Sequence, residues 1–275
     1  MLSIRKKTIF SNIWVALIIL VFSFPFYIML MGAFKKNTAL TRIPPDISPF
    51  SDLVITNFEY VIQKSDIFTW LINSFTIAGG VALITVFIAA TAGYALAKIR
   101  FKLSSVVFSV VIATMILPKQ LLLIPNYLVA LNLGLTNSLI GVILTSVAAP
   151  FGIFLCRQFM RTIPTELIES AEVDGCSEMG KFLRIMLPLS LPALGALGIF
   201  AFFASFNDFL WQLVMISSKD LHTIPIGIAM FAQQASRNVG YQMMAVTLAT
   251  VPLMILFILF QRFFIRGVTM GSIKG

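Results

Sequence analysis

The chain has 275 residues, of which 59% are hydrophobic and only 11% are charged, and its formal net charge is +9 at neutral pH. Its mean hydropathy is +0.96. This composition is far too apolar for a soluble globular domain, so we expect lipid to surround most of the folded chain.

Long hydrophobic runs predict where the chain crosses the membrane. A bilayer core about 30 Å thick requires roughly 20 apolar residues in a helix. Six runs of about this length occur, at residues 9–33, 70–97, 104–123, 138–159, 185–211 and 243–264. They predict an all-α integral membrane protein with a single transmembrane domain over residues 1–275.

The first run follows a basic cluster at residues 5–7 and must be distinguished from a cleavable signal peptide. The apolar region of a signal peptide has about 7 to 15 residues and ends at small residues. Here the run is longer and continues through the aromatic residues and proline at 24–27. We therefore predict a retained span.

The third run admits two arrangements, because Pro118, Lys119 and Gln120 interrupt it. Residues 104–123 either form one span, or residues 121–133 lie along the outer interface of the membrane.

Lysine and arginine residues predict the orientation, since cytoplasmic loops carry the positive excess. With the N-terminus inside, 13 of the 20 basic residues fall in inner loops, and acidic residues dilute the others. We therefore expect both termini, the loop 161–184 and the tail 265–275 to be cytoplasmic, and the loop 34–69 to be external.

The positive charge is spread over loops beside the membrane, where anionic lipid headgroups attract it. No loop concentrates it as a nucleic-acid surface would, so we expect membrane lipid and no nucleic acid among the partners. Cys156 and Cys176 both fall on the predicted reducing side. They are therefore expected to be small buried residues and not a disulfide.

The inner loop 161–184 differs from the others because it holds five of the eleven acidic residues. Pro164 suits a first helical position, acidic residues favour a helix N-terminus, and Gly175 can end a helix in the left-handed conformation. Ser177 can then cap a second short helix.

The pattern predicts a helix, a tight turn and a second helix that project from the membrane. A solvated connector is the alternative, but the loop mixes acidic and apolar residues at helical spacing, which favours a partner surface. The candidate apolar anchors of that surface are Ile168, Val173, Met179 and Phe182.

One motif in this loop resembles a known family. Glu169, Ser170 and Ala171 are followed after three residues by Gly175, after nine more by Ile185, and then by Leu187 with Pro188. This spacing is similar to the EAA loop of permeases in binding-protein-dependent ABC importers. Ser170 replaces the usual alanine, which is a small-for-small change.

Further stretches resemble the carbohydrate-importer branch of that family, although Phe206 stands where many relatives have tryptophan. They cover nearly the whole chain and are Trp70 with Asn73 and Ser74, residues 94–97 before Phe101, Pro118 and Gln120 with Ile124 and Pro125, residues 207–210, residues 223–225, and the C-terminal run from Gln261 through Gly267 and Gly271 to Lys274 and Gly275.

The resemblance implies a type I ABC importer permease fold, with six transmembrane helices and a cytoplasmic EAA coupling loop, in a bacterial or archaeal inner or plasma membrane. It implies that two homologous permease subunits pair, that ATPase subunits bind their EAA loops, and that an external binding protein delivers the solute. The implied solute is a sugar or oligosaccharide. The implied coupling residues are Glu169, Ser170, Ala171, Asp174, Gly175, Ile185, Leu187 and Pro188.

ATP and magnesium would bind the partner ATPase, so we expect no cofactor, metal or catalytic residue on this chain. Residues 175–181 do fit seven positions of a phosphate-binding P-loop, but Phe182 replaces the Ser or Thr that binds magnesium. No buried strand precedes the glycine either. The energy source is therefore expected to be a separate protein.

Two other classes of protein are alternatives to a permease. A membrane enzyme is disfavoured because the chain has one histidine, His222, and no Gly-x-Ser-x-Gly motif. An ion-coupled secondary transporter of a small polar solute is the stronger alternative, but such proteins bury ionisable groups near the membrane midplane. Asp208 is the only acidic residue in or near a span, and it falls at the predicted outer end.

Polar residues near the ends of the spans are the candidates for lining the solute pathway. Hydrogen bonding between helices is the alternative role for each of them. They are Asn73, Ser74, Asn126, Tyr127, Asn207 and Asp208.

Overall fold

The computed structural model describes residues 2–49, 51–147 and 150–269. Every regular element in these ranges is a helix, and one isolated bridge joins Lys35 and Leu53, so the all-α prediction is confirmed. The elements are α1 (Leu2–Ala33), α2 (Asn37–Leu40), α3 (Thr56–Lys64), α4 (Ile67–Lys98), α5 (Ser104–Ile116), η1 (Lys119–Leu122), α6 (Leu123–Asn132), α7 (Leu139–Ser146), α8 (Pro150–Thr162), α9 (Glu166–Val173), α10 (Glu178–Lys181), η2 (Phe182–Met186), α11 (Leu187–Phe206), α12 (Phe209–Met215), η3 (Lys219–Leu221), α13 (Ile224–Gln234) and α14 (Val239–Thr269).

Four helical segments in the described ranges are long and apolar enough to cross a membrane, namely Asn12–Ala33, Ile67–Lys98, Glu178–Phe206 and Val239–Gln261. Two bent pairs qualify if each counts as one span. These are Ser104–Ile116 with Lys119–Asn132, bent by 94°, and Leu139–Ser146 with Pro150–Thr162, bent by 50°. Each of the six predicted runs therefore corresponds to one long helix or one bent pair.

The third run does not form a single helix, and its proline explains the break. Leu117, which precedes Pro118, has an extended conformation with φ −76° and ψ 122°. A proline disfavours the α conformation of the residue before it, so the helix ends at Ile116. The fourth run is also divided, with the gap at residues 148–149 outside the described ranges.

The fifth and sixth helices have other bounds than the sequence predicts. The fifth is continuous from Glu178, through the π-helical turn η2, and ends at Phe206 and not at residue 211. It ends there because Asp208 begins a separate helix by accepting a hydrogen bond from the Trp211 N–H. Helix α14 extends to Thr269, so residues 265–269 of the predicted tail are helical, and residues 270–275 lie outside the described ranges.

The described chain divides into two compact units, each of which we treat separately. The first unit comprises Met1–Phe68 and Gly227–Met254, and the second comprises Thr69–Ile226 and Ile255–Gly275.

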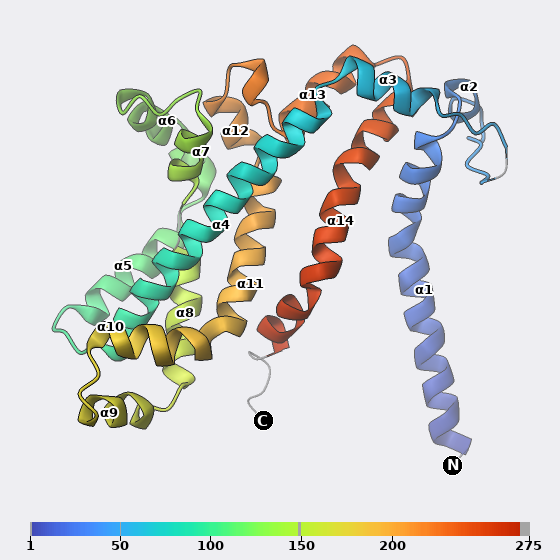
Figure 1. The fold of residues 1–275 in the computed structure, drawn as a ribbon. Coiled ribbons are helices and arrows are strands. Elements are labelled where there is room, and N and C mark those ends of the chain that lie inside the picture. The colour runs from blue at the N-terminus through green and yellow to red at the C-terminus, as the bar shows by residue number, and fades with distance from the viewer. Residues whose placement is uncertain (1, 50, 148–149, 270–275) are drawn as a thin grey trace. The chain divides into compact units, whose positions relative to one another are not determined.

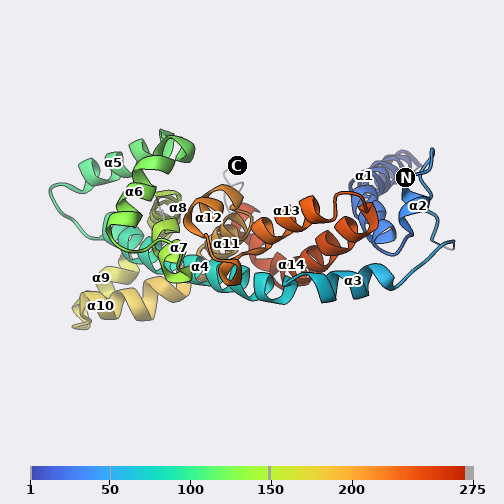
Figure 2. The same ribbon diagram turned by 90° about the horizontal axis from the view of Figure 1, so that it is seen from above.

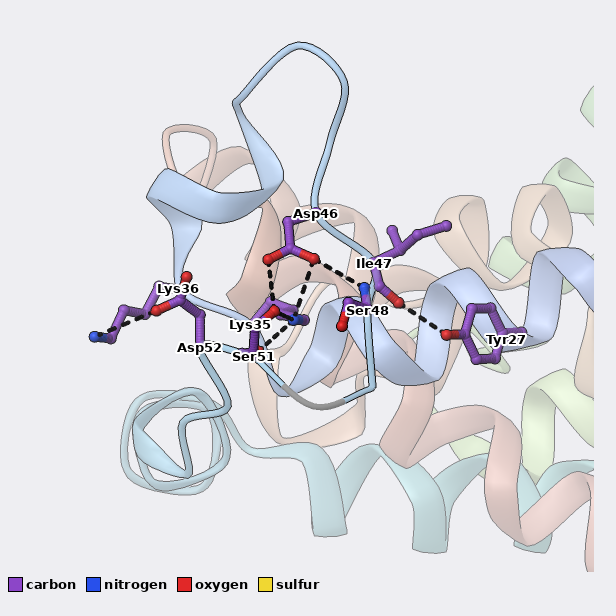
Figure 3. Close-up of polar contacts among 8 residues, drawn as sticks. All are labelled: Tyr27, Lys35, Lys36, Asp46, Ile47, Ser48, Ser51 and Asp52. Atoms are coloured by element: carbon purple, nitrogen blue, oxygen red, sulfur yellow. Dashed lines mark hydrogen bonds and ion pairs between the residues drawn. The ribbon is translucent and has the colours of Figure 1, made fainter.

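In the first unit, polar contacts fold the loop between α1 and α3. The Lys35 side chain is fully buried, donates to the carbonyl and the hydroxyl of Ser51, and lies 3.5 Å from an Asp46 carboxylate oxygen. The same carboxylate accepts hydrogen bonds from the Ser51 hydroxyl and the Ser48 amide (Figure 3). Tyr27 of α1 donates to the carbonyl of Ile47, which ties the loop back to the helix.

In the second unit, apolar side chains form two clusters at different levels of the helices. One cluster joins α4, α8, α9, η2 and α11, and the other joins α4, α6, α7, α12 and α13. Helices α9 and α10 lie at one end of this unit, and α6, α7 and α12 lie at the other (Figures 1 and 2). Gly93 permits close packing of α4 on α8, because a Cβ there would lie 2.6 Å from Cβ of Cys156.

Candidate functional site

The predicted helix, turn and helix of the inner loop form α9, a turn at Gly175 and α10. Gly175 has φ +77°, so the predicted left-handed conformation is confirmed. The Cys176 amide donates to the carbonyl of Ala171 at 2.9 Å, and the Gly175 amide donates to that of Glu172 at 3.0 Å. These two bonds make a Schellman motif, which satisfies the last carbonyls of α9 and reverses the chain.

Ser177 begins α10, as predicted. Its extended backbone ends the turn, and its hydroxyl accepts a hydrogen bond from the Gly180 amide at 3.2 Å. Pro164 lies just before α9 and not at its first helical position, since α9 begins at Glu166.

Two of the four predicted apolar anchors attach the loop to the rest of the second unit. Ile168 of α9 and Phe182 of η2 are buried in the cluster that also includes α4, α8 and α11. Val173 is 89% exposed and Met179 is 64% exposed. The two pairs therefore have opposite surroundings: Ile168 and Phe182 hold the loop in place, and no residue of the described ranges covers Val173 or Met179 to a large extent.

An ionic network connects α9, α10 and α4. The Lys181 side chain is buried, and its Nζ lies 2.6 Å from Glu178 and 3.1 Å from Glu172. The Tyr94 hydroxyl of α4 donates to the other carboxylate oxygen of Glu178 at 3.0 Å. The ring of Tyr94 also packs against Phe182, with centroids 5.3 Å apart. A displacement of α9 would therefore be transmitted through charged and aromatic contacts to the end of α4.

Hydrogen bonds from Lys98 hold the other end of α9. The Lys98 ammonium group, at the last residue of α4, donates to the Ile163 carbonyl at 2.6 Å and to the Thr165 hydroxyl at 3.2 Å. The connection between α8 and α9 is thereby fixed to the same helix that contacts α10.

The predicted coupling residues fall into two groups. Glu169, Ser170 and Asp174 are exposed on α9 or at its end, while Ile185 and Leu187 pack against the buried cluster where the loop joins α11. Ala171 and Gly175 supply backbone to the turn, and Pro188 stands in the first turn of α11. The structure thus places these residues on one continuous segment, and their role in coupling stays a prediction.

The P-loop-like stretch has a different geometry from a nucleotide site. The lysine that would reach a phosphate is Lys181, and its ammonium group contacts Glu172 and Glu178 instead. Two carboxylates beside it would repel a phosphate.

Asn73 and Ser74 of α4 are two of the predicted pathway residues. Both side chains are buried, and both form hydrogen bonds. The Asn73 amide donates to the carbonyls of Asp220 and His222, each at 2.9 Å. The Ser74 hydroxyl accepts from the Ile224 amide at 2.8 Å. These contacts match the alternative role, because they fix the segment before α13 to α4.

The other four candidates do not gather with Asn73. Asn126 is exposed on α6, and Tyr127 packs on the cluster of α4, α6, α7, α12 and α13. Asn207 donates to the Phe203 carbonyl at 2.8 Å, and Asp208 caps α12. These bonds make the corner between α11 and α12, and their part in a pathway remains untested.

Sequence reasoning missed the network residues Tyr94, Glu172, Glu178 and Lys181 as functional candidates. The Glu178–Lys181 pair has a sequence signal, since residues three apart on a helix are neighbours. No local pattern indicates the bond from Tyr94, because 84 residues separate it from Glu178.

Comparisons with known proteins identify the family. The model of the family described as binding-protein-dependent transport system inner membrane component matches residues 85–270. An arabinooligosaccharides transport system permease protein of Halalkalibacterium halodurans is 36% identical over 92% of this chain and 91% of its own. An sn-glycerol-3-phosphate transport system permease protein of Salmonella typhi is 31% identical over 96% of each chain.

A solved structure supports the fold. A chain from the crystal structure of a bacterial ABC transporter involved in import of the acidic polysaccharide alginate matches with a TM-score of 0.80. The match covers 95% of this chain and 98% of that chain at 20% identity, and so concerns the fold alone. On the family match and these relatives, the chain belongs to the inner membrane components, or permeases, of binding-protein-dependent transport systems.

Proposed function

We propose that the chain is one of two paired permease subunits in an ATP-driven importer, and that it forms half of the pathway for a sugar or oligosaccharide. An external binding protein delivers the solute, and separate ATPase subunits hydrolyse ATP. Both termini and α9–α10 face the cytoplasm in this proposal. Family membership favours it over an ion-coupled secondary transporter.

The proposed coupling role rests on one observation: the loop has a buried side and an exposed side. Ile168 and Phe182 are buried, while Val173 and Met179 are exposed beside the exposed Glu169. A short helix with apolar and acidic groups on its free face suits a groove on a partner, where the apolar groups are gripped and the charges set the register.

The network behind this face gives a route for force. Lys181 joins α9 to α10, and Glu178 joins α10 to Tyr94 at the inner end of α4. Movement of the ATPase subunits on binding ATP would displace α9, and these contacts would carry the displacement to the membrane helices. ATP thereby biases two arrangements of the permease.

The solute assignment draws on relatives with two kinds of substrate. Transport system permeases for arabinooligosaccharides and for sn-glycerol-3-phosphate both match over most of this chain. The higher identity to the first, and the resemblance noted in the sequence, favour a sugar or oligosaccharide.

Reconstitution in proteoliposomes tests the proposal. The chain is purified with its co-purifying subunits, and ATP hydrolysis is measured with and without the binding protein loaded with candidate sugars. We expect hydrolysis to rise with a loaded binding protein and the purified chain alone to hydrolyse none. Solute uptake by the chain alone, driven by an ion gradient, would overturn the proposal.

A further inference from the structure

A basic hollow lies in the second unit where the end of α4, the turn after it, the start of α5 and α8 meet. Its volume is about 560 Å³. Four of its lining residues are Arg100, Lys102, Arg157 and Arg161, and its lining contains no acidic residue. Side chains from segments more than 50 residues apart therefore direct positive charge at one space.

These four charges are not neutralised within the described part of the chain. None of them has a carboxylate within 4.0 Å there, whereas Lys35 and Lys36 each have one and Lys181 has two. Like charges that share a hollow repel one another. A bound anion would relieve it.

Arg157 is already oriented for such an anion. Its Nε donates to the Leu96 carbonyl at 3.1 Å, and its guanidinium carbon lies 3.6 Å from the ring centroid of Phe108. Phe108 in turn stacks on Phe154 at 6.2 Å. The Arg157 guanidinium group is thus held by its Nε–H bond and by the contact of one of its faces with the Phe108 ring. Its other N–H groups can make bidentate contact with a phosphate.

A second, apolar hollow of about 420 Å³ lies along α5 in the same unit. It starts at Ser105, the residue after Ser104 of the basic hollow, and is lined further by Val106, Ser109, Val110 and Ala113. No side chain of α5 is buried in this chain. From residue 105 to residue 113 the helix rises about 12 Å, which suits the first part of an acyl chain.

We propose that these two hollows form one binding site for an anionic phospholipid, with its phosphate among Arg100, Lys102, Arg157 and Arg161 and an acyl chain along α5. Basic pockets beside membrane helices are suited to anionic headgroups. A free phosphate would use the basic hollow alone, and an acidic protein surface would leave the α5 hollow unexplained. This site is separate from the proposed transport function and does not depend on it.

Photolabelling of the importer in detergent tests the site. The probes are phosphatidylglycerol and phosphatidylcholine that carry a photoreactive group in one acyl chain. We expect phosphatidylglycerol to label a peptide containing residues 105–113 several-fold more strongly than phosphatidylcholine does. Equal labelling by the two lipids would overturn the proposal.

Variants at exposed positions test the headgroup contacts without disturbing the fold. Each basic residue near an anionic lipid contributes roughly a fivefold factor in binding, so Arg100→Gln with Arg161→Gln should weaken labelling by about 25-fold. Arg184→Gln, an exposed arginine of the second unit outside the hollow, is the matched control and should change it little. Equal effects of Arg161→Gln and Arg184→Gln would refute a specific site.

Competition separates the sources of the anion. Excess unlabelled phosphatidylglycerol should abolish the labelling, and the same concentration of inorganic phosphate should not. Equal competition by phosphate would assign the basic hollow to a soluble anion and overturn the lipid site. Loss of ATPase subunits from the Arg100→Gln, Arg161→Gln complex, with phosphatidylglycerol labelling unchanged, would assign it to a protein partner.

Discussion

Lys181 and Glu178 lie one helical turn apart on α10, and Lys181 Nζ is 2.6 Å from a Glu178 carboxylate oxygen. Because the same ammonium group also contacts Glu172, this one side chain joins both helices of the loop. Lys181→Met keeps the length of the side chain and removes the charge. We expect sugar uptake to fall several-fold, while nucleotide binding by the complex is unchanged.

Arg184→Met is the matched control for Lys181→Met, since it removes an exposed positive charge three residues later. It should retain most of the uptake. Photolabelling by an ATP analogue reports nucleotide binding. Specific labelling of this chain that disappears in Lys181→Met would show that the P-loop-like stretch binds ATP after all.

Gly175 should be sensitive to substitution for a reason confined to the backbone. Its φ is +77°, and a Cβ there would have no heavy atom within 4 Å. A branched side chain therefore costs roughly 1–2 kcal/mol through conformation alone. Gly175→Val should insert into the membrane normally but retain much less ATPase subunit during purification, and Gly175→Asn should partly restore it because asparagine tolerates this region.

Gly134 provides the comparison for Gly175. It has φ +66° and equally open surroundings, but it lies between α6 and α7. Gly134→Val should introduce similar strain without releasing the ATPase subunit. If both valine variants retain it at the wild-type level, α9–α10 is not the coupling element.

Asn73 should prove structural. Asn73→Ala removes two hydrogen bonds to the segment before α13, one of them buried, and their loss should cost about 1–3 kcal/mol. We expect a lower unfolding temperature of the detergent-solubilised protein, with no change for the exposed Asn126→Ala. A changed apparent affinity for solute at unchanged stability would instead favour a place for Asn73 in the pathway.

The proposed orientation can be tested at two exposed positions. Ile43 is fully exposed in the loop after α1, and Val173 is 89% exposed on α9. In a background with Cys156 and Cys176 replaced by alanine, Ile43→Cys should react with a membrane-impermeant reagent in intact cells. Val173→Cys should react only after the membrane is opened, and the reverse result would invert the topology.

Asp46 should make the first unit sensitive to acid. Hydrogen bonds from Ser51 and from the Ser48 amide, with the nearby charge of Lys35, hold the pKa of Asp46 below its ordinary value of 3.8. A carboxyl group with a lowered folded-state pKa stabilises the fold above its unfolded value and loses this effect as the pH falls through the folded value. The unfolding temperatures of wild type and Asp46→Asn should therefore differ at about pH 6 and converge below about pH 3.8.

The sequence predicted the helical elements well where the signal was local. Hydrophobic length located the six runs, and the turn at Gly175 with its cap at Ser177 followed from residue type alone. Local signals failed at the corner of Asn207 and Asp208, where the hydropathy continues through a break that hydrogen bonding creates.

Contacts between residues far apart in the chain could not be predicted from the sequence. The partners of Asn73 lie 147 and 149 residues away, so its polarity indicated a pathway as readily as a hydrogen bond. The burial of Lys181 likewise depends on Glu172 and on the packing of η2 against α4. Such side chains acquire their roles only when the helices assemble.

The break at Pro118 has a consequence for the thickness of the surrounding membrane. Helix α5 has 13 residues, which at 1.5 Å per residue reach about 20 Å. A typical hydrocarbon core is about 30 Å thick, and α6 turns away by 94°. Beside α5 we therefore expect the bilayer to thin to meet a short helix, at a cost that grows with each ångström of hydrophobic mismatch. Bilayers of shorter acyl chains should consequently relieve this deformation and stabilise the protein.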